Sequence, residues 1–211
     1  MKIYITRHGK TVWNQEKRLQ GRKDSPLIQE GIDNAYALKE YIKDIHFDYI
    51  YSSPIQRAYN TATIIFDSKR IIKDDRLLEM NFGDFEGKKI SELLNRDDHL
   101  YYNMWHHPEL FTRINNGESY NDVIFRCHSF IDTLKSLDND TNVMVVTHGM
   151  YFIVLICTML NLEVKDFVLY NQKVVDGCSV TIVDYTDDKF KIEVYNKNDF
   201  LPHIFNESFS K

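Results

Sequence analysis

Three apolar runs of the chain are each followed by a cationic or proton-carrying side chain. Arg7 and His8 follow a run at the N-terminus, and His148 follows the run at residues 143–147. Arg57 comes shortly after a third run. Arginine forks bind the non-bridging oxygens of a phosphate, and a histidine can act as a nucleophile or exchange a proton. These residue types indicate phosphate chemistry, with His8 as the predicted nucleophile.

A single Arg-His-Gly sequence is too short to be specific, because a solvated histidine in an exposed turn has the same sequence. The surrounding pattern strengthens the chemical interpretation. Each apolar run has the length of a buried strand, and helical patterns alternate with the runs. Strand-helix-strand alternation predicts parallel strands whose carboxyl ends share one edge of a sheet. We therefore expect the four candidate residues to converge there: Arg7, His8, Arg57 and His148.

Two amphipathic helices are expected in the N-terminal part. The first runs from Gly31 to about Asp44 and has one apolar stripe. The second is predicted to begin with Ser53 as N-cap and Pro54 as its first helical residue. This start places Arg57 in the first turn, close to the carboxyl end of the preceding strand.

The C-terminal part has its own helix and hairpin signals. Ser119 and Asp122 are spaced as a capping box, and helical periodicity then continues for about four turns. An apolar helix is expected from Met150. Alternation over residues 178–195, interrupted by an Asp-rich turn, predicts a β-hairpin that completes the sheet. The aromatic tail at 199–211 is expected to pack on the protein, but its partner is not evident.

Two segments lack a regular period. Residues 12–27 are polar and are predicted to form a long loop over the site. Residues 80–116 are rich in aromatic side chains and are predicted to form a lid-like excursion from the sheet. Trp105 with the neighbouring His106 and His107 could bind a metal or substrate, although a helix that packs its aromatic side chains is the simpler interpretation.

The overall composition limits the class of protein. The 211 residues fit one domain, with 43% hydrophobic and 27% charged residues. The net charge of -5 argues against a nucleic-acid partner. The three cysteines lack metal or disulfide spacing, and the longest apolar stretch, 150–160, is too short for a membrane span. No leader pattern precedes the first strand, so we expect a soluble, cytoplasmic protein.

A series of short motifs extends from residue 2 to about residue 185. They are Arg7-His8-Gly9, Asn14 after Trp13, Gln20-Gly21, Ser52-Ser53-Pro54 with Arg57, Glu79 before Phe82-Gly83 and Glu86-Gly87, Gly117-Glu118-Ser119, and Thr147-His148-Gly149. Together and in this order they resemble the histidine phosphatase superfamily, phosphoglycerate mutase branch. The resemblance implies a three-layer α/β sandwich, with a mostly parallel central sheet and helices on both faces.

The resemblance also implies a covalent mechanism. His8 would attack phosphorus and become a phosphohistidine, while Arg7, Arg57 and His148 stabilise the phosphoryl oxygens. Glu79 would protonate the leaving alkoxide and then deprotonate the incoming water or second substrate. No metal or other cofactor is expected, because the arginines neutralise the phosphate charge.

The substrate-binding residues are predicted from the same resemblance. They are Asn14, Gln20, Gly21 and Gly149, and Lys10 is added to them because of its own charge beside the histidine motif. Lys10 departs from the family pattern, in which an acidic or small polar residue is frequent, and could attract a second anionic group. Glu118 has two open interpretations, stabilisation of a helix N-terminus and contact with substrate.

The favoured function is a metal-independent phosphomonoester hydrolase that acts on a small phosphorylated metabolite. The alternative is a cofactor-dependent phosphoglycerate mutase, which the short chain disfavours because such mutases carry additional segments. A third possibility is an inactive phospho-ligand-binding protein. Sugar phosphates, phosphoglycerates and α-ribazole phosphate all stay open as substrates. The oligomeric state stays open as well, a homodimer included.

Overall fold

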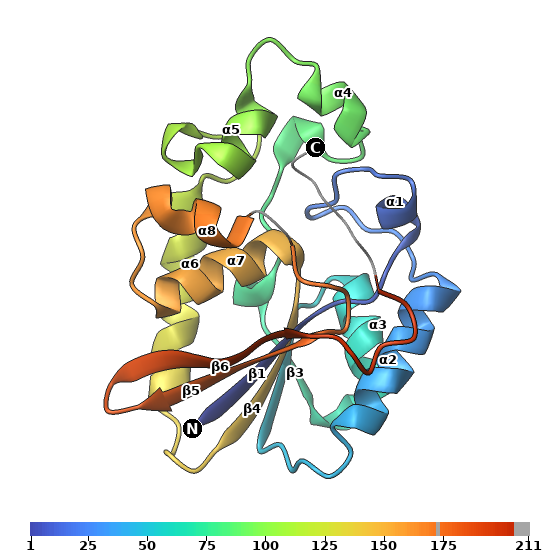
Figure 1. The fold of residues 1–211 in the computed structure, drawn as a ribbon, viewed down its shortest axis with the longest axis vertical. Coiled ribbons are helices and arrows are strands. Elements are labelled where there is room, and N and C mark those ends of the chain that lie inside the picture. Colours follow the sequence, from blue (N-terminus) through green and yellow to red (C-terminus); the bar gives the residue numbers. More distant parts are fainter. Residues whose placement is uncertain (172–173, 205–211) are drawn as a thin grey trace.

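The computed structural model describes residues 1–171 and 174–204 (Figure 1). Within them the strands form one six-stranded sheet in the order β3-β2-β4-β1-β5-β6. The strands are β1 (Lys2–Arg7), β2 (Tyr49–Ser52), β3 (Ile71–Lys73), β4 (Asn142–Thr147), β5 (Val180–Thr186) and β6 (Lys189–Lys197). The first four strands are parallel, and the β5-β6 hairpin adds antiparallel pairing at one edge. The predicted α/β sandwich with a mostly parallel sheet is confirmed.

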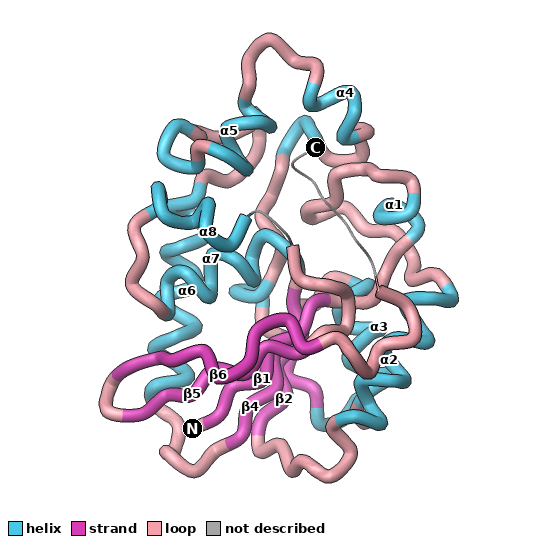
Figure 2. The backbone as a smooth tube through the Cα atoms, in the orientation of Figure 1, coloured by secondary structure: helices cyan, strands magenta, loops and turns pink. Residues whose placement is uncertain are grey.

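Helices cover both faces of the sheet and extend beyond its carboxyl edge (Figures 1 and 2). The α-helices are α1 (Val12–Gln15), α2 (Gln29–Tyr41), α3 (Gln56–Ile65), α4 (Ile90–Leu94), α5 (Leu100–His106), α6 (Tyr120–Lys135), α7 (Gly149–Met159) and α8 (Val168–Asn171). Short 3-10 turns are η1 (Ser68–Arg70), η2 (Asp75–Leu77), η3 (Gly83–Phe85), η4 (Pro108–Leu110) and η5 (Val164–Phe167).

The two faces of the sheet have separate apolar cores, as the period of two along each strand requires. On β4, Val143 and Val145 face a core that includes α6 and α7, whereas Met144 and Val146 face α2 and α3. Helix α7 is buried along its whole length. Burial on both faces explains why β4 reads as a continuous apolar run.

Several predicted elements are confirmed. Helix α6 begins with the capping box in which Ser119 and Asp122 bond each other's backbone amides. The hairpin turns at Asp187 and Asp188, which both have positive φ values of 51° and 58°. This is the geometry of the tight turns that match the twist of paired strands. The predicted β-hairpin that completes the sheet is therefore confirmed.

Three local predictions were wrong. Helix α2 begins and ends earlier than the predicted Gly31–Asp44, with Ile28 as an N-cap that forms no side-chain bond. Helix α3 has Ile55 as its N-cap, so Ser53 lies before the helix and is used elsewhere. Residues 12–27 are not all loop, because Thr11 and Asn14 form a capping box that starts α1. A four-residue helix is too short to show a helical period.

The described part of the tail packs against the sheet's α2 side. Leu201 is buried in that core, and the ring of Phe200 stacks on Tyr41 with a centroid distance of 4.1 Å. Phe205 and Phe209, which belong to the predicted tail, lie outside the described residues. No helix in 1–171 or 174–204 combines the length and apolarity needed to cross a bilayer.

Candidate active site

The four predicted residues converge at the carboxyl ends of the central strands. Arg7 ends β1, His8 follows it, and His148 follows β4, which lies between β1 and β2. Arg57 lies in the first turn of α3, just beyond β2. All four are buried, with exposed fractions between 0% and 6%. The strand order thus brings together side chains that are far apart in sequence.

The His8 ring is held with one nitrogen ready for attack. Its Nδ1 lies 2.7 Å from the carbonyl oxygen of Gly9. Because a carbonyl can only accept, Nδ1 carries the hydrogen and Nε2 keeps its lone pair. Arg57 Nε donates to this Nε2 at 3.1 Å. Burial, reinforced by the charges of Arg57 and Arg7, holds the pKa of His8 well below that of an ordinary histidine, so the imidazole is neutral.

His148 lies beside His8, with ring centroids 5.2 Å apart. Its Nε2 is 2.7 Å from Ser53 Oγ, which also accepts a bond from the amide of Ile55. Burial and the nearby charge of Arg57 hold the pKa of His148 well below its usual value. Ser53 therefore contacts a predicted site residue, although the sequence had indicated it only as a helix cap and as part of the Ser52-Ser53-Pro54 motif.

Arg57 also fixes the loop that covers the site. Its Nη1 donates to the carbonyl of Lys23 at 2.9 Å and to Asp24 Oδ1 at 3.1 Å. Its Nη2 donates to the carbonyl of Gly21 at 2.7 Å. A Cβ atom at Gly21 would lie 2.8 Å from the main-chain carbonyl oxygen of Met80, so this close approach favours glycine. Gly21 thus supports the site through its backbone.

Glu79 places its carboxylate at the N-terminus of α7. Oε1 accepts from the amides of Met80 and Tyr151, both at 2.8 Å, and Oε2 accepts from the amide of Met150 at 3.0 Å. Burial raises the pKa of Glu79, while these amides and the charge of Arg57 oppose the rise. A carboxyl with a raised pKa is suited to carry a proton to a leaving group.

Arg7, His8 and Glu79 line a cavity, whereas Arg57, His148 and Gly21 are not among its lining residues. Its polar lining comprises Arg7, His8, Asn14, Arg18, Gln20, Glu79 and Gly149. Its apolar lining comprises Leu19, Phe82, Trp105, Met150 and Val174. Thr11 Oγ1 lies 2.9 Å from both Asn14 Oδ1 and Gln20 Oε1, so its single hydroxyl hydrogen can be donated to either amide oxygen. The lining thus combines polar side chains with a group of apolar ones.

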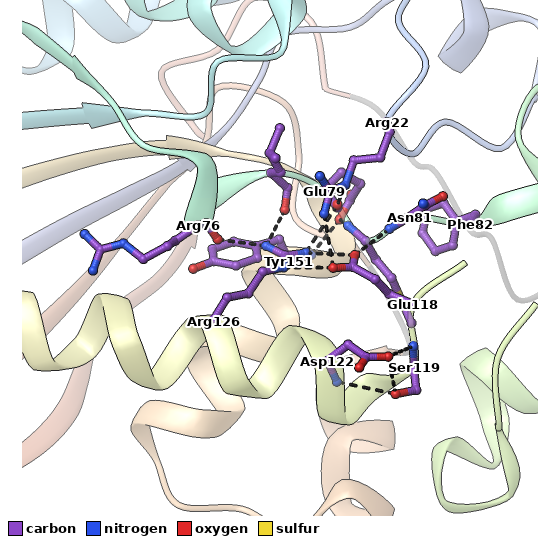
Figure 3. Close-up of polar contacts among 12 residues, drawn as sticks. Arg22, Arg76, Glu79, Asn81, Phe82, Glu118, Ser119, Asp122, Arg126 and Tyr151 are labelled. Atoms are coloured by element: carbon purple, nitrogen blue, oxygen red, sulfur yellow. Dashed lines mark hydrogen bonds and ion pairs between the residues drawn. The ribbon is translucent and has the colours of Figure 1, made fainter. Parts of the chain in front are cut away.

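Some predicted residues lie outside this lining. Lys10 Nζ pairs with Glu30 Oε2 of α2 at 2.8 Å, and Lys10 does not belong to the residues around the cavity. Glu118 also lies outside the lining and bonds Arg22, Arg126 and the amide of Asn81 instead (Figure 3). The structure therefore gives Glu118 a supporting position rather than a place in the cavity wall.

The aromatic excursion contributes to the wall. Trp105 of α5 and Phe82 line the cavity, whereas the His106 ring stacks on Tyr102 with a centroid distance of 4.4 Å. Leu19, Met150 and Val174 are further lining residues that the sequence did not single out. Leu19 and Met150 adjoin the predicted Gln20 and Gly149, and this adjacency is the signal that could have identified them. The described residues hold no cluster of three His, Cys, Asp or Glu side chains arranged for a metal.

An α/β sheet with two histidines and two arginines at its carboxyl edge defines a protein of the phosphoglycerate mutase-like class. The chain belongs to the histidine phosphatase superfamily (branch 1), whose family model matches residues 3–198. It is an enzyme of this superfamily, and both the fold class and the resemblance predicted from sequence are confirmed.

Similar proteins carry several names. A probable phosphoglycerate mutase GpmB of Yersinia pestis (strain Pestoides F) is 31% identical over 189 residues, which are 89% of this chain and 86% of that protein. The solved structure of Bacillus stearothermophilus YhfR is 30% identical with a TM-score of 0.86, covering 95% of this chain and 98% of that one. The α-ribazole phosphatase from Shigella flexneri is 25% identical with a TM-score of 0.81, covering 93% and 96%.

Proposed function

We propose that the protein hydrolyses small phosphomonoesters through a phosphohistidine on His8, without a metal ion. The observation that carries this proposal is the neutral His8 ring, with Nε2 unprotonated and aimed at the Arg57 guanidinium. A phosphoryl group that approaches Nε2 meets a cation at the same point. The nucleophile and the group that neutralises phosphoryl charge are thus in contact before substrate binds.

In the first step, Nε2 of His8 forms a bond to phosphorus as the bond from phosphorus to the leaving oxygen breaks. Glu79, in its protonated form, gives its proton to the departing oxygen, so an alcohol leaves. Arg7, Arg57 and His148 stabilise the phosphoryl oxygens. The two arginines supply positive charge in the role that Mg²⁺ has in many phosphoryl transfers, so the proposed reaction needs no metal.

In the second step, water attacks the phosphorus of the phosphohistidine. Ionised Glu79 takes a proton from this water as the bond from phosphorus to Nε2 breaks. Inorganic phosphate leaves, His8 regains its lone pair, and Glu79 is again protonated. The raised pKa of Glu79 suits both roles, because the carboxyl exchanges its proton at a higher pH than an exposed glutamate.

The cavity wall supports an apolar leaving group. Part of the described lining is apolar and, apart from the indole of Trp105, has no polar group that could bind a sugar or a carboxylate. It comprises Leu19, Phe82, Trp105, Met150 and Val174. The cation that lines the cavity besides Arg7 is Arg18. Its guanidinium already donates to Glu16 and to the carbonyl of Gly87. This favours aryl or alkyl phosphates over phosphoglycerate, whose carboxylate calls for a dedicated cation.

A substrate panel tests the proposal. Phosphate release is measured for aryl and alkyl phosphomonoesters, sugar phosphates and α-ribazole phosphate, while interconversion of 3-phosphoglycerate and 2-phosphoglycerate is followed in parallel with a bisphosphoglycerate primer. We expect hydrolysis, fastest with apolar leaving groups and unaffected by chelator. Rapid interconversion with little phosphate release would establish the mutase alternative, which the GpmB relative represents. Loss of activity with chelator would overturn the metal-free mechanism.

A further inference from the structure

The backbone that carries Glu79 is held by a side chain from another element. Arg126 of α6 donates through Nη1 to the carbonyl of Arg76 at 2.7 Å and to the carbonyl of Leu78 at 2.6 Å (Figure 3). Its Nη2 donates to the carbonyl of Glu79 itself at 3.3 Å. One planar guanidinium therefore fixes three carbonyls around the general acid.

Glu118 completes this support from the start of α6. Its Oε2 accepts the amide of Asn81 at 2.7 Å, and its Oε1 accepts from Arg126 Nε at 3.2 Å. Burial opposes ionisation, but Arg126 and the Asn81 amide hold the pKa of Glu118 below its usual range. An ionised Glu118 therefore fixes the direction of the Arg126 fork.

Arg22 reaches the same group from the loop that covers the site. Its Nε donates to the carbonyl of Glu79 at 2.7 Å, and its Nη2 lies 3.1 Å from Glu118 Oε1. The Glu79 carbonyl thus receives bonds from two guanidinium groups. Figure 3 shows Arg22 and Arg126 approaching Glu79 from different elements.

Arg126 also contacts the element that holds the Glu79 carboxylate. Its guanidinium lies 4.8 Å from the centre of the Tyr151 ring. The backbone amide of Tyr151 is one of the donors to Glu79 Oε1. Arg126 therefore packs against α7 while bonding the backbone of residues 76–79, so it connects the two elements whose relative position sets the carboxylate.

We propose that Arg126, held by Glu118 and assisted by Arg22, is a positioning residue that sets the place of the Glu79 carboxylate relative to the leaving oxygen. Arg126 and Arg22 both donate to the Glu79 carbonyl, and Glu118 bonds Arg126 and the Asn81 amide, so the three act through the backbone that carries Glu79. A shift of about 1 Å in a catalytic group can lower a rate roughly 100-fold. This inference rests on the proposed function, in which Glu79 supplies the proton.

The test is a leaving-group series, because a well-placed acid matters most when the leaving group is poor. The full-length chain is assayed with p-nitrophenyl, phenyl and alkyl phosphates. Arg126→Met is expected to lower kcat about 10- to 100-fold for alkyl phosphates and less than about threefold for p-nitrophenyl phosphate. Arg126→Lys is expected to fall between, since it keeps the charge but loses the fork.

Two further variants make the result specific. Glu79→Gln is expected to give the same steepened dependence on leaving-group pKa. Arg113→Met is the matched control, because it removes an arginine that pairs with Asp122 at the start of α6. The Arg113 side chain is 60% exposed, whereas that of Arg126 is 12% exposed. The leaving-group dependence of the control variant is expected to equal that of the unmodified protein. Arg22→Met replaces Arg126→Met if the latter does not fold by circular dichroism.

The outcomes separate the two proposals. An equal loss for all substrates in the Arg126 variant, with the dependence steepened in Glu79→Gln, would overturn the positioning role alone. An unchanged dependence in Glu79→Gln would overturn the acid role of Glu79 and the positioning role with it. Steepening in both variants, with none in Arg113→Met, would support the inference.

Discussion

Acidification should destabilise the fold through His8 and His148. Both rings are buried, and burial with nearby arginine charge holds the pKa of each well below that of an ordinary histidine. In the unfolded chain each has an ordinary pKa of about 6.5. Below that pH the unfolded chain therefore binds more protons than the native protein. The free energy of unfolding therefore falls as the pH falls. The stabilisation that comes from the neutral histidines is fully present above the unfolded pKa and is lost below it.

The size of this effect follows from the number of neutral rings. A histidine that stays neutral in the native state lowers the free energy of unfolding by about 1.4 kcal/mol per pH unit well below its unfolded pKa. Integrated from about pH 7 to about pH 5.5, this gives roughly 1.2 kcal/mol for each ring and about 2.5 kcal/mol for both. The raised pKa of Glu79 affects the free energy of unfolding in the opposite direction. No histidine is among the causes of that raised pKa, so the Glu79 contribution is expected to be the same in the histidine variants and to cancel in the comparison.

Urea unfolding at the two pH values measures the effect. The unmodified protein is compared with His8→Gln, His148→Gln and the double variant, none of which can titrate at the replaced position. We expect the double variant to lose about 2.5 kcal/mol less on acidification, and each single variant about half of that. An identical pH dependence in all four proteins would refute neutral, buried histidines in the native state.

Three substitutions test other parts of the site. Ser53→Ala removes the bond to His148 Nε2; we expect kcat to fall about tenfold and stability to fall by about 1–2 kcal/mol, and unchanged kinetics would contradict this role. Trp105→Ala opens the apolar wall; KM should rise about tenfold for aryl phosphates and less for small alkyl phosphates, whereas equal changes would contradict the wall. Lys10→Met removes a pair with Glu30; kcat/KM should change less than about twofold, and a large loss confined to substrates with a second anionic group would instead support substrate binding by Lys10.

The fold was predictable where the sequence signal is local and strong. Residues 143–147 form a continuous apolar run because β4 is buried on both faces. Ser119 and Asp122 predict the start of α6, because the two residues of a capping box lie within one turn and accept hydrogen bonds from each other's backbone amides. Helix α1 was missed because its capping box has Asn14 in place of the usual glutamate or glutamine, and because the helix ends after one turn and shows no helical period.

The central residues of the site were predictable because strand ends fix their positions. Arg7, His8 and His148 adjoin β1 and β4, so parallel pairing of these strands suffices to bring them together. Ser53 was misassigned because a serine before a helix has the sequence of an N-cap, and only the tertiary structure shows its bond to His148. Local spacing cannot reveal a partner that far along the chain.

Supporting residues leave even less trace in the sequence. Arg126 bonds main-chain carbonyls of residues 76–79, and any residue type supplies a carbonyl. No motif therefore marks its partners. For Lys10 the sequence indicated a role that the structure does not give it. A cation beside the histidine motif predicts contact with substrate, but the ion pair of Lys10 with Glu30 is visible only in the structure.

The most direct test of the account is to identify the phosphorylated residue during turnover. The protein is mixed with a ³²P-labelled aryl phosphate, quenched in alkali within one turnover, digested and mapped. We predict acid-labile, alkali-stable label on the peptide that contains His8, absent in His8→Ala and retained in Glu79→Gln. Label that persists in His8→Ala, or turnover by that variant at the unmodified rate, would contradict nucleophilic attack by His8.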